Sequence, residues 1–142
     1  MDQSLHNHQA AVPNPSCRFC RPDIESRVVA EFQTVWAFKD RYPVTRGHLL
    51  VAPKRHTPDW FSMTAEERRD ADCLIRILKD EIEMSDGTVC GFNIGINCGK
   101  CAGQTIFHAH IHLIPRRPGD TENPTGGVRG VIPGKMAYEA AE

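Results

Sequence analysis

The stretch that decides the fold is residues 103–114, GQTIFHAHIHLI, in which three histidines alternate with apolar residues. Successive side chains along a β-strand point to opposite faces, so His108, His110 and His112 share one face. The residues that fill the opposite face are small or apolar: Ala109, Ile111 and Leu113. The pattern therefore predicts a strand over 106–114, with a core on one side and three imidazoles on the other.

Three imidazoles on one strand face indicate a chemical site, because imidazole changes charge near neutral pH and serves as base, nucleophile or metal ligand. Two kinds of site fit the pattern. In one, histidines at i and i+2 bind a metal ion that activates a water molecule. In the other, the middle imidazole attacks a phosphorus atom while its neighbours hold the phosphate oxygens. The spacing alone fits both.

The rest of the chain predicts an α+β domain with five strands and one long helix. A capping box at Thr64-Ala65-Glu66-Glu67 begins the helix, and we expect it to end near Ser85-Asp86-Gly87, where glycine can adopt the left-handed capping conformation. Its apolar stripe consists of Ala71, Leu74, Ile77, Leu78 and Ile82. The four other strands are expected at 27–32, 34–39, 48–52 and 89–96.

Composition narrows the classes of function. The chain has 142 residues, 17 Lys and Arg against 18 Asp and Glu, and so no bulk basic field for binding nucleic acid. It has no apolar run of about 20 residues, which a membrane span requires. The polar start MDQSLHNHQ lacks the plan of a signal peptide, so we expect a cytoplasmic protein with no membrane partner.

The same survey predicts three regions. Residues 1–16 are rich in proline and polar groups and are expected to form a flexible tail. Residues 17–117 hold the expected sheet and helix and form the folded domain. Residues 118–142 form a C-terminal extension rich in glycine and proline, which is either an ordered loop or flexible.

Six cysteines are present, and four of them form two Cys-x-x-Cys pairs, Cys17 with Cys20 and Cys98 with Cys101. In a reducing compartment such pairs indicate metal binding or free thiols more than disulfides. The remaining two cysteines are expected to be small core residues: Cys73 and Cys90.

Taken together, these motifs resemble the histidine triad (HIT) family. The stretch from His108 to Ile114 follows the family signature of histidines separated by apolar residues, and it is preceded by Gly-Gln-Thr. Asn97 and the runs 37–40, AFKD, and 47–56, GHLLVAPKRH, also match in order and spacing. The resemblance covers roughly Cys17 to Arg117, and it implies a HIT-like antiparallel sheet that is completed by dimerisation.

The resemblance assigns roles around the phosphate. His110 would be the nucleophile that forms a transient nucleotidyl-histidine, and His112 would bind a non-bridging phosphate oxygen. Gly103 and Gln104 would hold the charge that develops on the phosphoryl group. Thr105 would assist the leaving group.

The resemblance also implies a nucleotide pocket. Asp40 and Asn97 match positions that contact ribose or phosphate, Phe38 would lie at the base, and His48 would be a further pocket residue. Ordinary packing is the alternative for Phe38 and His48. Arg116, Arg117 and residues 126–130 would either bind a polyphosphate tail or belong to a solvated extension.

One branch of the family carries structural zinc, and its ligands would here be Cys17, Cys20, His56 and His108. Such a closed tetrahedral set leaves no open position for water. A site of four cysteines that recruits Cys98 and Cys101 is the rival arrangement, and a chain without metal is the third.

The implied activity is hydrolysis or nucleotidyl transfer at the α-phosphate of a purine nucleoside phosphoramidate, a nucleotidyl ester or a dinucleoside polyphosphate. Adenine would be the preferred base and a homodimer the expected assembly. The alternatives are a metal-hydroxide hydrolase that uses the triad as ligands, and a nucleotide-binding regulatory protein with little turnover.

Overall fold

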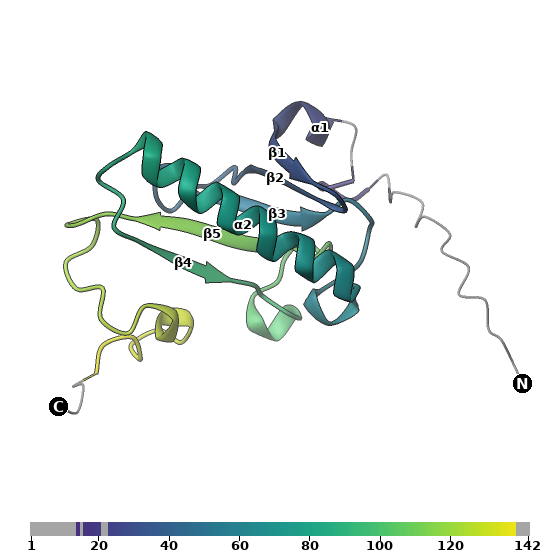
Figure 1. The fold of residues 1–142 in the computed structure, drawn as a ribbon. Helices are drawn as coiled ribbons and strands as arrows, with labels where there is room; N and C mark the ends of the chain where they lie inside the picture. Colours follow the sequence, from purple (N-terminus) through teal and green to yellow (C-terminus); the bar gives the residue numbers. More distant parts are fainter. Residues whose placement is uncertain (1–13, 15, 21–22, 139–142) are drawn as a thin grey trace, which may run out of the picture.

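The computed structural model describes residues 14, 16–20 and 23–138. It consists of one antiparallel sheet with strand order β1-β2-β3-β5-β4 and one long helix, α2 (Ala65–Ser85), packed across it (Figure 1). The strands are β1 (Val28–Phe32), β2 (Val35–Lys39), β3 (Leu49–Pro53), β4 (Gly91–Gly95) and β5 (Ile111–Arg116). The predicted α+β class, with five strands and one long helix, is confirmed.

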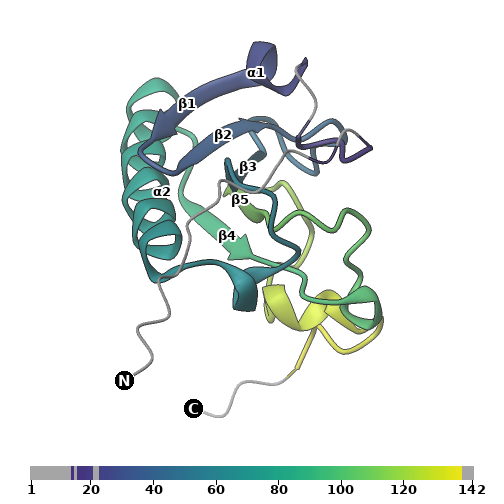
Figure 2. The same cartoon turned by 90° about the vertical axis from the view of Figure 1, so that its right-hand side faces the viewer.

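Helix α2 covers only one face of the sheet (Figure 2). Alternate residues of β2, β3 and β5 point toward the helix, among them Val51 and Leu113, and form a core with Leu74 and Leu78 of α2. The predicted apolar stripe holds except at Ile77, which is 42% exposed, while Ile75 packs against the core instead.

The opposite face of the sheet carries a second, smaller core and the candidate site. Phe38, Leu50 and Ala52 point to this side and pack against Phe19 and Ile24. His112 pairs with Leu50 across the ladder between β3 and β5, so its imidazole points to the same side. Because side chains alternate between the two faces along each strand, the residues that pack on α2 lie on one face and the candidate site residues lie on the other.

The start of β5 and the cap of α2 differ from expectation, while α2 ends where it was predicted to end. Strand β5 begins at Ile111 and not at residue 106, because Ala109 donates its N–H to the carbonyl of Thr57, in a loop, at 2.8 Å. Helix α2 ends at Ser85, and the residue that caps it, Asp86, has an extended backbone whose N–H donates to the Ile82 carbonyl. Gly87 therefore does not serve as a left-handed cap.

Short helical turns complete the described part of the chain. They are α1 (Asp23–Arg27), η1 (Trp60–Ser62), η2 (Lys100–Ala102) and η3 (Gly127–Val131). Of the predicted tail 1–16, only Asn14 and Ser16 lie within the described residues, and the end of the extension, 139–142, lies outside them. No helix within the described ranges is long and apolar enough to cross a membrane.

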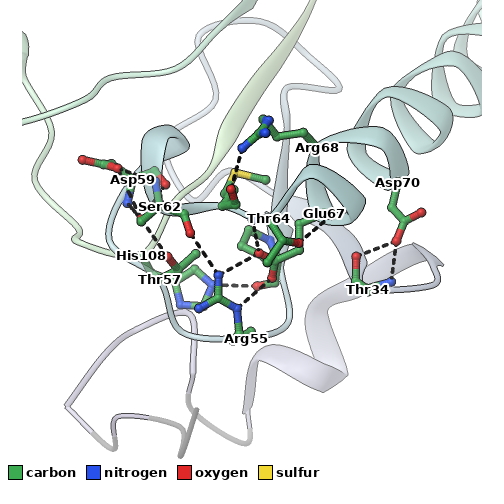
Figure 3. A network of polar contacts seen from close by, with 12 residues as sticks. Thr34, Arg55, Thr57, Asp59, Ser62, Thr64, Glu67, Arg68, Asp70 and His108 are labelled. Carbon is green, nitrogen blue, oxygen red and sulfur yellow. Dashed lines mark hydrogen bonds and ion pairs between the residues drawn. The ribbon is translucent and has the colours of Figure 1, made fainter. Parts of the chain in front are cut away.

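One buried carboxylate joins the start of α2 to the loop after β3 (Figure 3). Glu67 is 3% exposed and closes the capping box with Thr64, accepting the Thr64 N–H at 2.8 Å. The Arg55 guanidinium donates to both oxygens of the same carboxylate, at 2.8 and 3.1 Å. Burial alone would raise the pKa of Glu67, but these bonds and the Arg55 charge lower it.

We predict that Glu67→Ala lowers the free energy of unfolding by about 2–4 kcal/mol, because it removes a helix cap and leaves the Arg55 charge without its partner. Denaturant unfolding measures the loss. The matched control is Glu66→Ala on the exposed side of the same turn, which should change stability by less than about 0.5 kcal/mol. Equal effects of the two substitutions would contradict the assignment.

Candidate functional site

The candidate site is a pocket of about 720 Å³ on the face of the sheet opposite α2. Strand β5 and the residues before it supply His110 and His112, while the loop between β2 and β3 supplies Asp40 and His48. The loop after β4 adds part of the opposite wall: Asn97, Gly103, Thr105, Ile106 and Phe107. The pocket therefore brings together segments that are far apart in sequence.

His110 is oriented by a backbone carbonyl. Its Nδ1 lies 2.8 Å from the carbonyl oxygen of His108, which can only accept, so Nδ1 carries the proton and donates. The side chain is buried and lines the pocket, and burial lowers its pKa against the opposing effects of the His108 carbonyl and the Asp40 charge. His110 is thus a neutral imidazole whose Nε2 has a free lone pair.

A chain of hydrogen bonds fixes the tautomers of the other two imidazoles. The Val44 N–H donates to Nδ1 of His48 at 3.1 Å, so the proton of His48 is on Nε2. That Nε2 lies 2.9 Å from Nδ1 of His112 and donates to it. The remaining proton of neutral His112 is then on Nε2, as a donor at the pocket.

Asp40 supplies the negative charge next to this chain. Its Oδ2 lies 3.4 Å from Nε2 of His48 and 3.8 Å from Nδ1 of His112. Burial nevertheless dominates, and with the charges of His110 and His48 it lowers the pKa of His112 to about 4. The pKa of His48 is lowered by burial as well. His48, His110 and His112 are therefore neutral at neutral pH.

Two predicted pocket residues lie elsewhere. Phe38 is fully buried in the core with its ring 4.9 Å from that of Phe19, and it is not among the residues that line the pocket, a position that favours the packing alternative. Gln104 is also buried behind the wall. Its amide nitrogen donates to Pro58 and Ile106 carbonyls at 2.6 and 3.1 Å, and its oxygen accepts from the Gly99 N–H.

Gln104 consequently supports the loop that presents Gly103 and Thr105, and its amide group is engaged by backbone atoms of that region. The C-terminal arginines are also engaged away from the pocket. Arg116 pairs with Asp120, and Arg117 pairs with Asp86. Both guanidinium groups serve structural ion pairs.

A second cluster, of two cysteines and two histidines, lies beside the pocket. The donor atoms of Cys17, Cys20, His56 and His108 all lie within 4.8 Å of one another. Sγ of Cys20 is 3.1 Å from Nδ1 of His56 and 3.4 Å from Nδ1 of His108, which is also 3.7 Å from Sγ of Cys17. Tetrahedral zinc, with bonds of about 2.3 Å to sulfur and 2.0–2.1 Å to nitrogen, sets S···N separations of about 3.5 Å.

Surrounding hydrogen bonds also suit a metal. Nε2 of His108 lies 2.7 Å from the Pro53 carbonyl and donates to it, which leaves Nδ1 free to coordinate. The Phe19 N–H donates to Sγ of Cys17 at 3.4 Å. Burial raises the pKa of the Cys20 thiol to about 11, so binding a metal would have to release this proton. The four residues fit a closed zinc site.

The other cysteines do not join this cluster. Within the described residues, the donor atoms grouped with Cys17 and Cys20 come from histidines and not from Cys98 or Cys101. All six cysteines are free thiols. Cys73 and Cys90 are exposed, which corrects their assignment to the core.

Asp40, His48 and His112 form a further group with metal-compatible spacing. Its hydrogen bonds argue against a metal, because the Val44 N–H occupies Nδ1 of His48 and leaves the proton on the nitrogen that would have to coordinate. These three residues are better suited to orienting His112.

The sequence alone did not identify Phe19 or the backbone groups of Val44 and Pro53. Phe19 is 5% exposed, and its ring centroid lies 5.0 Å from that of His110. Its position between Cys17 and Cys20 was the one available signal. Backbone N–H and C=O groups are nearly the same in every residue type, so the sequence does not indicate which of them bind the histidines.

Comparisons with known proteins identify similar sequences and similar structures. The HIT domain family model matches residues 21–119. Protein hit of Bacillus subtilis is 38% identical over 108 residues, which cover 71% of each chain. The asymmetrical bis(5'-nucleosyl)-tetraphosphatase of Schizosaccharomyces pombe is 34% identical over 102 residues, which cover 72% of this chain and 56% of that protein.

Among solved structures, a zinc-bound histidine triad family protein from Mycobacterium smegmatis superimposes with a TM-score of 0.67 at 37% identity. The superposition covers 75% of this chain and 78% of that one.

We predict that stability falls as the pH drops from about 6.5 to about 4. The pKa of His112 is lowered to about 4, against about 6.5 for an unperturbed imidazole, so the unfolded chain binds this proton first. The contribution of neutral His112 to the free energy of unfolding is complete above about pH 6.5 and is lost as the pH falls toward about 4. Urea unfolding at a series of pH values measures how steeply the free energy of unfolding depends on pH, and His112→Asn should make this dependence shallower. A His112 that titrates near 6.5 by NMR would contradict this.

Proposed function

This chain belongs to the HIT domain family, and from that premise we propose that it hydrolyses or transfers nucleotides through a nucleotidyl-histidine formed on His110. Its substrate class would be a purine nucleoside phosphoramidate, a nucleotidyl ester or a dinucleoside polyphosphate. The main support for this proposal is that Nδ1 of His110 lies 2.8 Å from the His108 carbonyl oxygen, which leaves Nε2 as the reactive nitrogen.

In the first step, the lone pair of Nε2 attacks the α-phosphorus, and the bond from phosphorus to the leaving group breaks. The imidazole becomes positively charged, and its Nδ1–H donates to the His108 carbonyl, which stabilises that charge. The leaving group takes up a proton from a water molecule as it departs, and we assign the relay of that proton to the hydroxyl of Thr105, which lines the pocket. The water that attacks in the second step returns a proton to solvent.

In the second step, water attacks the same phosphorus and the N–P bond breaks, which releases a nucleoside monophosphate and restores neutral His110. Another acceptor in place of water gives nucleotidyl transfer. Dividing one displacement into two lets the same nitrogen act as nucleophile first and as leaving group afterwards.

Phosphate oxygens would be held by donors around His110. His112 donates through Nε2–H, because His48 occupies its Nδ1 at 2.9 Å. The Gly103 and Gln104 N–H groups already donate to the Lys100 and Gly99 carbonyls, so we assign the Thr105 N–H as the further donor of this loop. The Gln104 side chain keeps the loop in position through its bonds to Pro58 and Gly99. Asp40 and Asn97 line the pocket and are assigned to ribose or phosphate contacts.

Zinc is proposed as a structural ion on Cys17, Cys20, His56 and His108, where it would brace the residues that precede β5. Four protein ligands leave no open position, so the ion would supply folding free energy and not a bound hydroxide. A metal-hydroxide hydrolase has less support, because His110 is outside the cluster and His48 keeps a proton toward His112.

We further propose a cytoplasmic homodimer that prefers adenine. Six free thiols are consistent with a reducing compartment. Strand β4 is at the edge of the sheet with Ile94 52% exposed, and within the described residues its outer side pairs with no other strand. A second copy could therefore pack against this edge. The base preference rests on the family resemblance.

We predict that His110→Ala keeps the fold but loses turnover by a factor of at least about 10³, since it removes the nucleophile. AMP release from adenosine phosphoramidate and from diadenosine polyphosphates measures the activity and ranks the substrate classes. Rapid quenching of the wild type should trap a nucleotide on His110. A label on another residue would refute the mechanism, and tight binding without turnover would indicate a regulatory nucleotide-binding protein.

We predict that elemental analysis finds about one zinc ion per chain and that Cys17→Ser and Cys20→Ser lose it, because each variant removes a thiolate from a four-ligand site. Cys73→Ser, at an exposed cysteine outside the cluster, is the matched control and should retain zinc. Loss of zinc from Cys98→Ser would instead favour the four-cysteine site.

A further inference from the structure

Phe19 occupies an unusual position between the metal cluster and the nucleophile. It lies between Cys17 and Cys20 in sequence, and its ring is buried between two side chains of the site. The ring centroid lies 5.0 Å from that of His110 at 78° and 6.0 Å from that of His108 at 82°, both in edge-to-face geometry.

The segment that carries Phe19 is held to the domain by side chains. Residues 16–20 belong to no strand, and within the described part of the chain their backbone hydrogen bonds are local: the Cys17 N–H donates to Asn14 and the Cys20 N–H to Cys17. The Cys17 and Cys20 side chains meet His56 and His108, and Phe19 packs on Phe38.

Two routes therefore connect the cluster to His110. The first is the chain itself, because the carbonyl of His108 accepts the Nδ1–H of His110. The second is the Phe19 ring, which the two cysteines flank and which rests against the His110 imidazole. Only the second depends on a segment with no backbone pairing to the sheet.

We propose that Phe19 is a positioning residue that couples the metal cluster to the nucleophile: metal bound by Cys17 and Cys20 seats the Phe19 ring against His110 and so fixes the angle at which Nε2 faces the pocket. This rests on the proposed function of His110. The hydrogen bond at Nδ1 restrains one edge of the His110 ring, and the Phe19 ring packs against that imidazole edge-to-face and restrains it from a second direction.

The coupling acts on rate more than on affinity. Phe19 also lines the pocket, but the ring touches the attacking imidazole directly, and a misplacement of about 1 Å at a reacting atom can lower a rate by about 100-fold. Metal loss and Phe19 truncation are then two ways of producing the same fault, a nucleophile that is present but poorly aimed.

The experiment compares Phe19→Leu and Phe19→Ala with Phe61→Ala, whose side chain is 80% exposed and outside the pocket. Zinc content and thermal unfolding are measured first. We expect Phe19→Leu to retain zinc and fold, with kcat reduced about 10- to 100-fold, KM changed less than about threefold, and the ¹⁵N shifts of His110 altered. Phe61→Ala should match the wild type in all five measurements.

A metal-removal cycle supplies the second measurement. Chelation of the wild type should lower kcat and shift the His110 ¹⁵N signals in the same direction as Phe19→Leu. In Phe19→Leu, chelation should add little, because the two changes act through one contact and are non-additive. If Phe19→Ala fails to fold, Phe19→Leu carries the comparison.

Three results would overturn the coupling: wild-type kcat and His110 signals in zinc-loaded Phe19→Leu, an equal effect of chelation in both proteins, or a purified chain with no metal. Failure of the proposed function is distinguishable, because it would appear as a wild type without turnover. The His110 signals and AMP binding would still report whether Phe19 and the metal are coupled.

Discussion

The site depends on a hydrogen bond at one ring nitrogen of each histidine of the triad, which leaves the other nitrogen for nucleophilic attack, phosphate binding or metal coordination. The His108 carbonyl accepts a hydrogen bond from Nδ1–H of His110, and the Pro53 carbonyl accepts one from Nε2–H of His108. The Val44 N–H donates to Nδ1 of His48, whose Nε2–H in turn donates to His112. A histidine has two similar nitrogens, so a strand of histidines alone would have no defined chemistry. The backbone gives each ring a single tautomer.

Burial strengthens this arrangement. It lowers the pKa values of His48, His110 and His112, so the rings stay neutral and keep the lone pairs that nucleophile and acceptor require. Asp40 opposes the effect at short range without reversing it. The low exposure of the pocket and its chemistry are therefore linked properties.

The sequence predicted the elements well, because helix caps and period-two alternation are local. Thr64 begins α2 as expected, and the five strands occur in the predicted order. Side-chain partners were less predictable, since Phe38 and Gln104 are buried by segments distant in sequence. An apolar strand residue does not reveal whether its face is pocket or core, and Cys73 shows that a small apolar type can remain exposed.

Because α2 covers the face of the sheet that carries no site residue, the outer surface of this helix can be altered without touching the pocket. The outward surface of the helix carries exposed ion pairs, among them Arg76 with Asp72 and Lys79 with Glu83, each of which contributes little to folding. Labels, surface-attachment groups or fused partners placed there would be separated from the pocket by a full sheet.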